Sequence, residues 1–208
     1  MTNTHDPKTA DAARLAADME DALQRHVIAT WFPRSIDHVH GGFHCGFDRT
    51  WAPHGSTDKV LEFQSRQALL AADVHRAYPE IDGLKDAALH GLAMLRGPLW
   101  DDAHGGWYTA TDRQGTPTLG GAKHVHGFTY AIVSAVGIFE ATGDERALDL
   151  AKDAFRWLDR HAHDGRHGGY RGFYTRDGRR IVNRSANPLG GDLDPIGTPL
   201  MLKESNVF

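Results

Sequence analysis

Apolar residues recur with helical periodicity in five stretches of the chain, and a sixth stretch begins near Pro199. In the last complete one, leucines, alanines and Phe155 alternate with charged side chains after a capping residue, Asp144. The first is expected to begin with Pro7 at its first helical position and to end at Trp31-Phe32-Pro33. The predicted helices cover residues 7–30, 58–78, 83–96, 123–141 and 145–161.

Charge sorts these helices into two layers. Segment 123–141 has no charged residue between Phe128 and Phe139, and a helix that is apolar all round is expected to be buried. Segment 58–78 is assigned to the same inner layer. Segments 83–96 and 145–161 each carry one apolar stripe, which predicts that they are outer helices. Links from an inner to an outer helix are short and the return links are long, so the long loops should gather at one end.

The long loops share one pattern, D-x-x-H-G-G-aromatic. Its copies begin at Asp37, Asp101 and Asp164, which are 64 and 63 residues apart. An aspartate that closes a turn, followed by two glycines that tolerate positive φ, predicts a short β-hairpin in each loop. Helix pairs repeating with these hairpins predict an all-α fold, half of an α/α toroid, with the long-loop end as its binding face.

Composition narrows the function classes. The 208 residues include 23 Lys+Arg and 27 Asp+Glu, so the chain lacks the basic surplus typical of nucleic-acid binders. Its single cysteine, Cys45, excludes an internal disulfide. Several of the 14 histidines are paired two residues apart, which is the wrong spacing for two metal ligands on one helix face. The polar N-terminus and the lack of an apolar run near 20 residues predict a cytoplasmic protein without a membrane partner.

Further stretches carry a resemblance to a known family. Lys59-x-x-x-x-Gln64-x-Arg66 opens the second predicted helix, and Lys123-His-Val-His126 opens the fourth. Together with the hairpins, these stretches resemble the N-acylglucosamine 2-epimerase family, which includes the cellobiose 2-epimerases. The resemblance extends from about residue 31 to residue 206. It implies an (α/α)6 barrel, of which residues 1–208 would form a single domain of roughly three helical hairpins, truncated at the C-terminus.

The resemblance also implies a chemistry, which is proton transfer at carbon 2 of an opened reducing sugar. The chain would then be a sugar 2-epimerase or aldose–ketose isomerase that needs no metal or other cofactor. Arg66 matches the family's active-site arginine and would stabilise the oxyanion of the enediolate. From the spacing alone, the alternative for Arg66 is an ion pair with Glu62.

The same resemblance suggests four substrate-binding residues, Lys59, Gln64, His126 and Asn206. His126 stands where the family usually has tyrosine, so its alternative role is that of a polar inner-helix residue without substrate contact.

Part of the family's machinery is missing from residues 1–208. Phe208 replaces the first histidine of the family's K-x-x-N-x-H-x-H segment, and the general acid/base histidines are absent. We therefore expect the chain alone to be inactive and to self-associate through the open edges of a half-barrel, where Leu200, Met201 and Phe208 would be exposed. The alternatives are a carbohydrate-active hydrolase on the same toroid, which needs two suitably separated carboxylates, and a non-catalytic carbohydrate-binding fragment.

Overall fold

The computed structural model describes residues 7–181, with side chains from residue 11 onward. The chain divides into two compact units with a boundary between Ser35 and Ile36, and each is described by itself. The expectation of one domain over residues 1–208 stays a prediction. The sixth helix expected near Pro199 lies outside the described residues.

The N-terminal unit is a run of helix in three parts, α1 (Pro7–Ala22), a π-helical stretch η1 (Leu23–Ile28) and α2 (Ala29–Ser35). The predicted stop at Trp31-Phe32-Pro33 is wrong, because α2 continues through Pro33 to Ser35. Proline interrupts a helix by removing one backbone donor and crowding the preceding turn. Here it lies two residues from the end of the helix, so few further hydrogen bonds depend on it.

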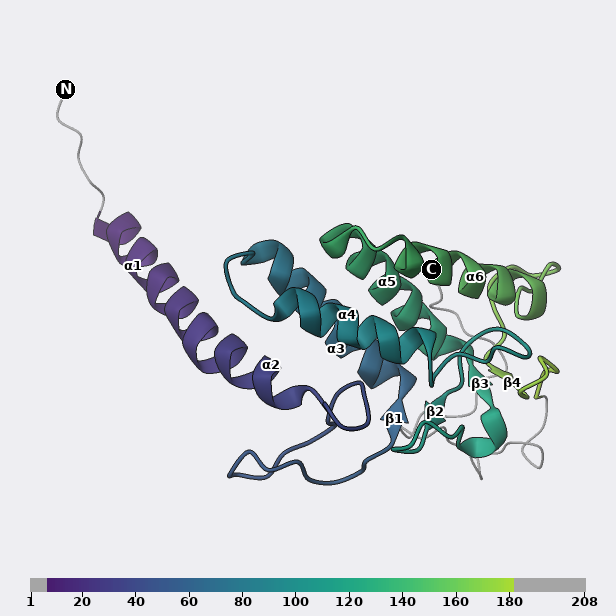
Figure 1. Cartoon of the computed structure of the whole chain (residues 1–208). Coiled ribbons are helices and arrows are strands. Elements are labelled where there is room, and N and C mark those ends of the chain that lie inside the picture. Colours follow the sequence, from purple (N-terminus) through teal and green to yellow (C-terminus); the bar gives the residue numbers. More distant parts are fainter. Residues whose placement is uncertain (1–6, 182–208) are drawn as a thin grey trace. The chain divides into compact units, whose positions relative to one another are not determined.

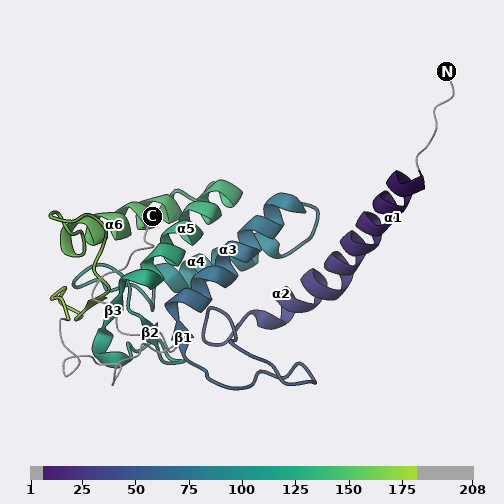
Figure 2. The same ribbon diagram turned by 180° about the vertical axis from the view of Figure 1, so that it is seen from behind.

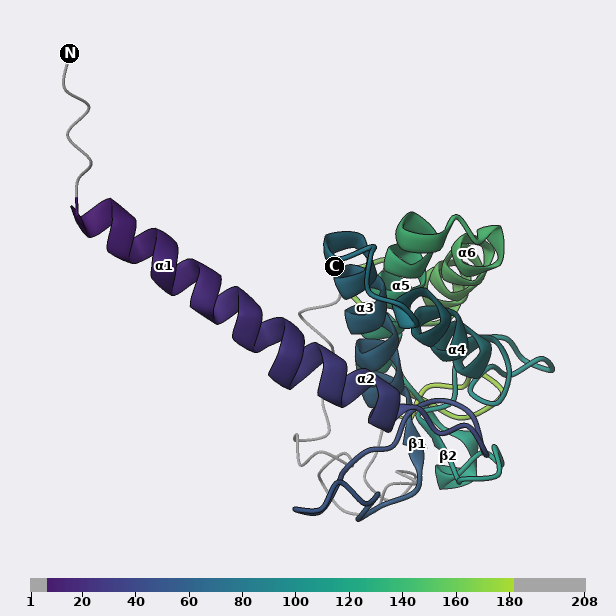
Figure 3. The ribbon, with the colours of Figure 1, turned by 60° about the vertical axis from the view of Figure 1, so that its left-hand side comes forward.

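Up to residue 181, the second unit contains four α-helices in two layers, and their bounds agree with the predictions to within three residues. The inner helices α3 (Leu61–Ala77) and α5 (Val125–Thr142) pack side by side, while α4 (Leu84–Arg96) packs on α3 and α6 (Glu145–His161) packs on α5. Figure 3 shows these layers, α3 with α5 and α4 with α6. The predicted α/α layering is confirmed.

Close helix packing depends on small residues. A Cβ added at Gly91 of α4 would lie 2.3 Å from the Cβ of Ala68 on α3, and one added at Gly137 of α5 would lie 2.5 Å from Leu69. The tight link between α5 and α6 forms as predicted, with Asp144 capping α6 by accepting a hydrogen bond from the backbone of Arg146.

Helix α5 is not buried all round. By length and composition alone it could cross a membrane, but 44% of its residues are buried and it packs against three other helices. Val133 is 51% exposed, and Leu70 on α3 is 43% exposed. Full burial of every apolar position was therefore the wrong expectation, because the inner layer has one face that the outer helices do not cover.

Four two-residue strands tie the loops to the inner helices. Strand β1 (Lys59–Val60), just before α3, pairs antiparallel with β2 (Ala110–Thr111) in the second long loop. Strand β3 (Lys123–His124), just before α5, pairs in the same way with β4 (Phe173–Tyr174) in the third. Figures 1 and 2 show the strands together at one end of the helices, as the loop lengths predicted.

The three D-x-x-H-G-G turns have the predicted geometry. In the first, Asp37 Oδ1 accepts hydrogen bonds from the backbone N–H groups of Val39 and His40 at 3.1 and 2.9 Å. Asp101 and Asp164 accept the corresponding pairs in the later copies. Both glycines of each turn have positive φ, and the aromatic residue forms a β-bridge across the turn.

A buried ion pair fixes each of the first two turns to the inner helix that follows. Lys59 Nζ lies 2.9 Å from Asp37 Oδ2, and Lys123 Nζ lies 3.1 Å from Asp101 Oδ2. All four side chains are at most 3% exposed. Burial alone would raise the pKa of Asp101, but hydrogen bonds from Arg176 and Lys123 hold that pKa well below its usual range.

We predict that alanine substitutions at the two glycines of the first turn differ in their effect on the free energy of unfolding, because one introduces backbone strain alone and the other also disrupts contacts. Gly41 and Gly42 both have positive φ, but only at Gly42 would a Cβ meet Gln64 Oε1, at 2.3 Å. Gly41→Ala should lower the free energy of unfolding by about 1–2 kcal/mol. Gly42→Ala should lower it by a further ~1–3 kcal/mol because it displaces buried hydrogen bonds. Equal losses in urea unfolding would contradict the packing described for Gln64.

A second prediction concerns acid stability. Because the pKa of Asp101 is lower in the folded than in the unfolded chain, its contribution is complete above about pH 4–5 and is lost as the pH falls below that range. Asp101→Asn should be less stable at pH 7, where it leaves Lys123 without its carboxylate, and should lose less stability on acidification. The matched control is Asp102→Asn at the exposed neighbouring position. Parallel acid dependence in Asp101→Asn and the unsubstituted chain, measured by urea unfolding, would refute the assignment.

Candidate active site

Arg66 lies on the uncovered face of the inner layer. It is an exposed residue in the second turn of α3, while Ala68, about 200° further around the helix, is buried against α4. The guanidinium carbon of Arg66 lies 4.0 Å from the ring centroid of Tyr130 on α5. Arg66 therefore bridges the two inner helices on the side that points away from α4.

Glu62 does not pair with Arg66, so that alternative is not what the structure shows. The Glu62 carboxylate lies instead 3.7 Å from Nδ1 of His124, whose ring stacks on Phe173 at a centroid distance of 4.1 Å. Within residues 11–181, no carboxylate forms an ion pair with Arg66. Its position thus depends on the aromatic contact with Tyr130, which leaves the in-plane N–H groups of the guanidinium able to donate.

His126 lies close to this arginine. It is half-buried one turn before Tyr130, and the two rings meet edge to face with their centroids 5.2 Å apart. The ring of His124 lies 5.7 Å from that of His126. The structure thus brings Arg66 and His126 together through Tyr130 and places a buried imidazole behind them.

Tyr130, His124 and Glu62 were not predicted as site residues. The signal for Tyr130 was available in the sequence, because residues four apart on a helix share a face and His126 was already a candidate. Glu62 and His124 come together only through the packing of α3 on α5, which no local spacing reveals.

Lys59 and Gln64, the two predicted substrate-binding residues at the start of α3, are buried against the first hairpin. Lys59 is 2% exposed, and its ammonium donates to Asp37 and, at 3.2 Å, to the carbonyl of Phe43. Gln64 is fully buried, accepting from the backbone N–H of Phe43 at 2.7 Å and donating to its carbonyl at 2.9 Å. Both side chains hold the first hairpin against α3, and contact of either with a substrate stays a prediction. Asn206 lies outside the described residues.

The arrangement suits the stabilisation of negative charge. A guanidinium held by its face presents in-plane donors, and the nearby N-terminus of α3 adds positive electrostatic potential. Within the described part of the chain, no group of three or more His, Cys, Asp or Glu side chains could hold a metal ion.

A family model for N-acylglucosamine 2-epimerase (GlcNAc 2-epimerase) matches residues 41–189. The chain belongs to this family. It is 26% identical over 178 residues to a cellobiose 2-epimerase from Ruminococcus albus, a match that covers 85% of this chain and 44% of that protein. It is 31% identical over 132 residues to a D-mannose isomerase from Thermobifida fusca, a match that covers 63% of this chain and 31% of that protein. The chain thus spans less than half the length of these curated relatives.

Solved structures support the same fold. The cellobiose 2-epimerase from Spirochaeta thermophila superposes with a TM-score of 0.74 at 25% identity, over 87% of this chain and 43% of that one. A family 76 mannosidase from Bacteroides thetaiotaomicron superposes with a TM-score of 0.60 at 15% identity, over 85% and 43%. At this identity the mannosidase shows likeness of fold alone, and the α/α toroid class is confirmed.

Proposed function

We propose that this chain supplies the arginine-bearing part of a sugar 2-epimerase or aldose–ketose isomerase site. The observation that carries the proposal is the placement of Arg66 on the uncovered inner face, over Tyr130 and near His126. The names of two relatives, a cellobiose 2-epimerase and a D-mannose isomerase, refer to reducing sugars, which supports the same substrate class.

In the proposed reaction, a base removes the proton at carbon 2 of the opened sugar. The electron pair moves toward the carbonyl oxygen, and the resulting enediolate is reprotonated on the opposite face of carbon 2 or at carbon 1. Arg66 donates hydrogen bonds to the oxygen that gains charge, which lowers the barrier most when the donors are already in place. His126 would contact a sugar hydroxyl, since its imidazole can donate or accept.

A hydrolase is less well supported by the geometry. That reaction needs two carboxylates flanking a glycosidic bond. Asp101 is fully buried between Lys123 and Arg176 and closes its own turn, so it has no access to a substrate. Proton transfer at carbon 2 is therefore the proposed chemistry.

We predict that purified 1–208 does not epimerise cellobiose or mannose. The acid/base histidines implied by the family resemblance are absent from this sequence, and losing such a group typically costs about 10²–10⁴-fold. The measurement is deuterium incorporation at carbon 2 from heavy water, followed by NMR. Robust incorporation by 1–208 that persists in Arg66→Met would contradict both the inactivity and the role of Arg66.

Sugar binding provides a test that does not depend on turnover. Cellobiose should shift the side-chain NMR signals of Arg66 and His126. Arg66→Met should weaken binding by about 10- to 100-fold, because one hydrogen bond to a charged group contributes about 1.5–3 kcal/mol. Arg49→Met, at an exposed position in the first long loop, is the control. Unchanged affinity for cellobiose in Arg66→Met would show that Arg66 does not contact the sugar.

The non-catalytic alternative predicts a different gene structure. Sequencing the locus beyond Phe208 should reveal an in-frame continuation that encodes histidine-bearing helices if the proposal is right. An immediate stop codon would favour a carbohydrate-binding fragment.

Self-association also stays a prediction, since the residues expected at the open edge, from Leu200 to Phe208, lie outside the described part of the chain. Exposed Leu70 and Val133 on the inner layer add apolar surface that a second copy could cover. Sedimentation of 1–208 should show species larger than a monomer. A monomer with a sharp cooperative thermal melt would contradict this expectation.

A further inference from the structure

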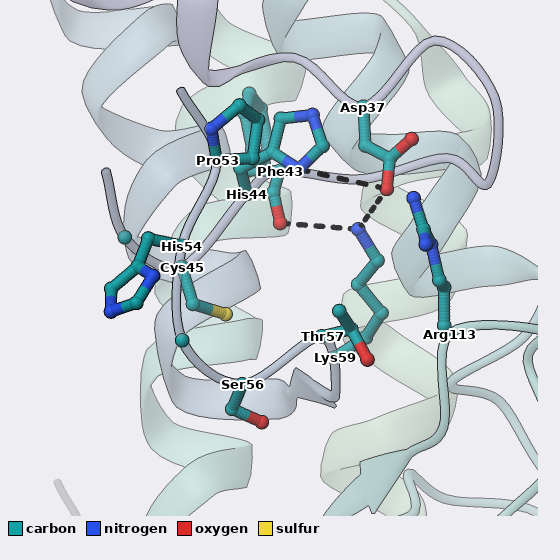
Figure 4. Close-up of a pocket in the computed structure, with 12 residues that line it drawn as sticks. Asp37, Phe43, His44, Cys45, Pro53, His54, Ser56, Thr57, Lys59 and Arg113 are labelled. Carbon is teal, nitrogen blue, oxygen red and sulfur yellow. Dashed lines mark hydrogen bonds and ion pairs between the residues drawn. The ribbon is translucent and has the colours of Figure 1, made fainter. Parts of the chain in front are cut away.

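A pocket lies beside the first buried ion pair, away from the residues assigned to the sugar. It is formed by the first long loop, by Lys59, and by Arg113 of the second long loop. The cavity has a volume of about 120 Å³ and is partly open to solvent. Figure 4 shows Arg113 beside Lys59, with His44 and His54 on the opposite side. Ser56 and Thr57 also line the pocket.

The next repeat shows how an arginine equivalent to Arg113 is paired. Lys59 pairs in register with Thr111, and Lys123 pairs with Tyr174, so Arg113 and Arg176 occupy equivalent positions two residues further on. Arg176 forms an ion pair with Asp101, with Nε and the terminal nitrogen at 3.2 and 3.3 Å from the carboxylate oxygens.

Arg113 lacks this arrangement. No carboxylate among residues 11–181 forms an ion pair with it, and its Nε is buried without a hydrogen-bond partner. A buried guanidinium N–H that donates to nothing is costly, and a charged donor more so. An anion entering the pocket would supply the missing acceptor.

Space for a ligand arises from one difference between the repeats. Tyr108 follows the aromatic residue of the second turn, is 4% exposed and lies within cation–π distance of Arg176, at 5.5 Å. The equivalent residue in the first repeat is His44, which is smaller and lines the pocket. Burial lowers the pKa of His44, the Asp37 carboxylate at 3.8 Å from its Nδ1 raises it, and the charges of Lys59 and Arg113 lower it again. A bound anion would oppose that effect.

We propose that this pocket binds a small oxyanion of the phosphate or carboxylate class. Arg113 donates through Nε and a terminal nitrogen in the fork that suits two oxygens of one anion. His44 supplies a further donor, while Lys59 remains paired with Asp37 and balances the negative charge of that carboxylate. The site is independent of the proposed sugar chemistry, since it shares no residue with Arg66, His126 or Tyr130.

The test is a titration of 1–208 with inorganic phosphate at constant ionic strength, followed by the NMR signals of the His44 ring and the Arg113 Nε–H. We expect saturable shifts, a rise in the pKa of His44, and at least tenfold weaker binding in Arg113→Gln. Arg49→Gln makes the same charge change at an exposed position outside the pocket and should bind as the unsubstituted chain does.

A second variant guards against loss of folding. His44→Tyr introduces the residue that the second repeat carries there, so it should fold normally and exclude phosphate. Parallel titration with acetate distinguishes a carboxylate site from one that needs the higher charge of phosphate. The proposal is overturned if phosphate gives no saturable shift at millimolar concentration, if sodium chloride reproduces the shift, or if Arg113→Gln and Arg49→Gln bind equally.

Discussion

A buried lysine opposite a turn-closing aspartate constrains how each of the first two long loops meets the inner helix that follows it. The pairs Lys59–Asp37 and Lys123–Asp101 are inaccessible to solvent, so each charge depends on its partner. The first pair is reinforced by Gln64, which uses both ends of its amide on the backbone of Phe43. Since Arg66 is two residues, or about 200°, from Gln64, docking Gln64 onto the hairpin turns Arg66 toward the uncovered face. A structural contact thus sets the orientation of the proposed catalytic residue.

Side chains that differ between equivalent positions of the repeats determine which binding sites the repeats can form. In the third turn, Arg171 donates to Asp164 Oδ2 at 2.8 Å, and the Arg171 side chain is 29% exposed. Arg171, Tyr108 and His44 all directly follow the aromatic residue of their turns. The tyrosine fills its repeat, whereas the histidine leaves space next to an arginine without an acceptor. A repeated scaffold can therefore carry different sites at equivalent positions without changing its backbone.

The sequence predicted those features that depend on local interactions. The turns follow from an aspartate and two glycines within seven residues, and the helical layers follow from charge distribution along each helix. The roles of Lys59 and Gln64 could not be predicted, because a motif match says nothing about whether a polar side chain faces a substrate or a neighbouring backbone. Tyr130 and His124 join the site through contacts between helices separated by about 60 residues of sequence. Pro33 is a local signal that gave a wrong prediction, because a proline near the end of a helix did not stop α2.

The central claim is that Asp37 and Lys59 act as one unit that docks the first hairpin onto α3. A double-mutant cycle with Asp37→Asn, Lys59→Met and the combined variant, measured by urea unfolding at pH 7, tests it most directly. Lys59→Met should cost about 3–5 kcal/mol because it leaves a carboxylate buried without its cation. The combined variant should be more stable than the sum of the two single losses implies, by at least about 1 kcal/mol. Losses that add to within about 0.5 kcal/mol would show that the two side chains contribute independently and would contradict the account.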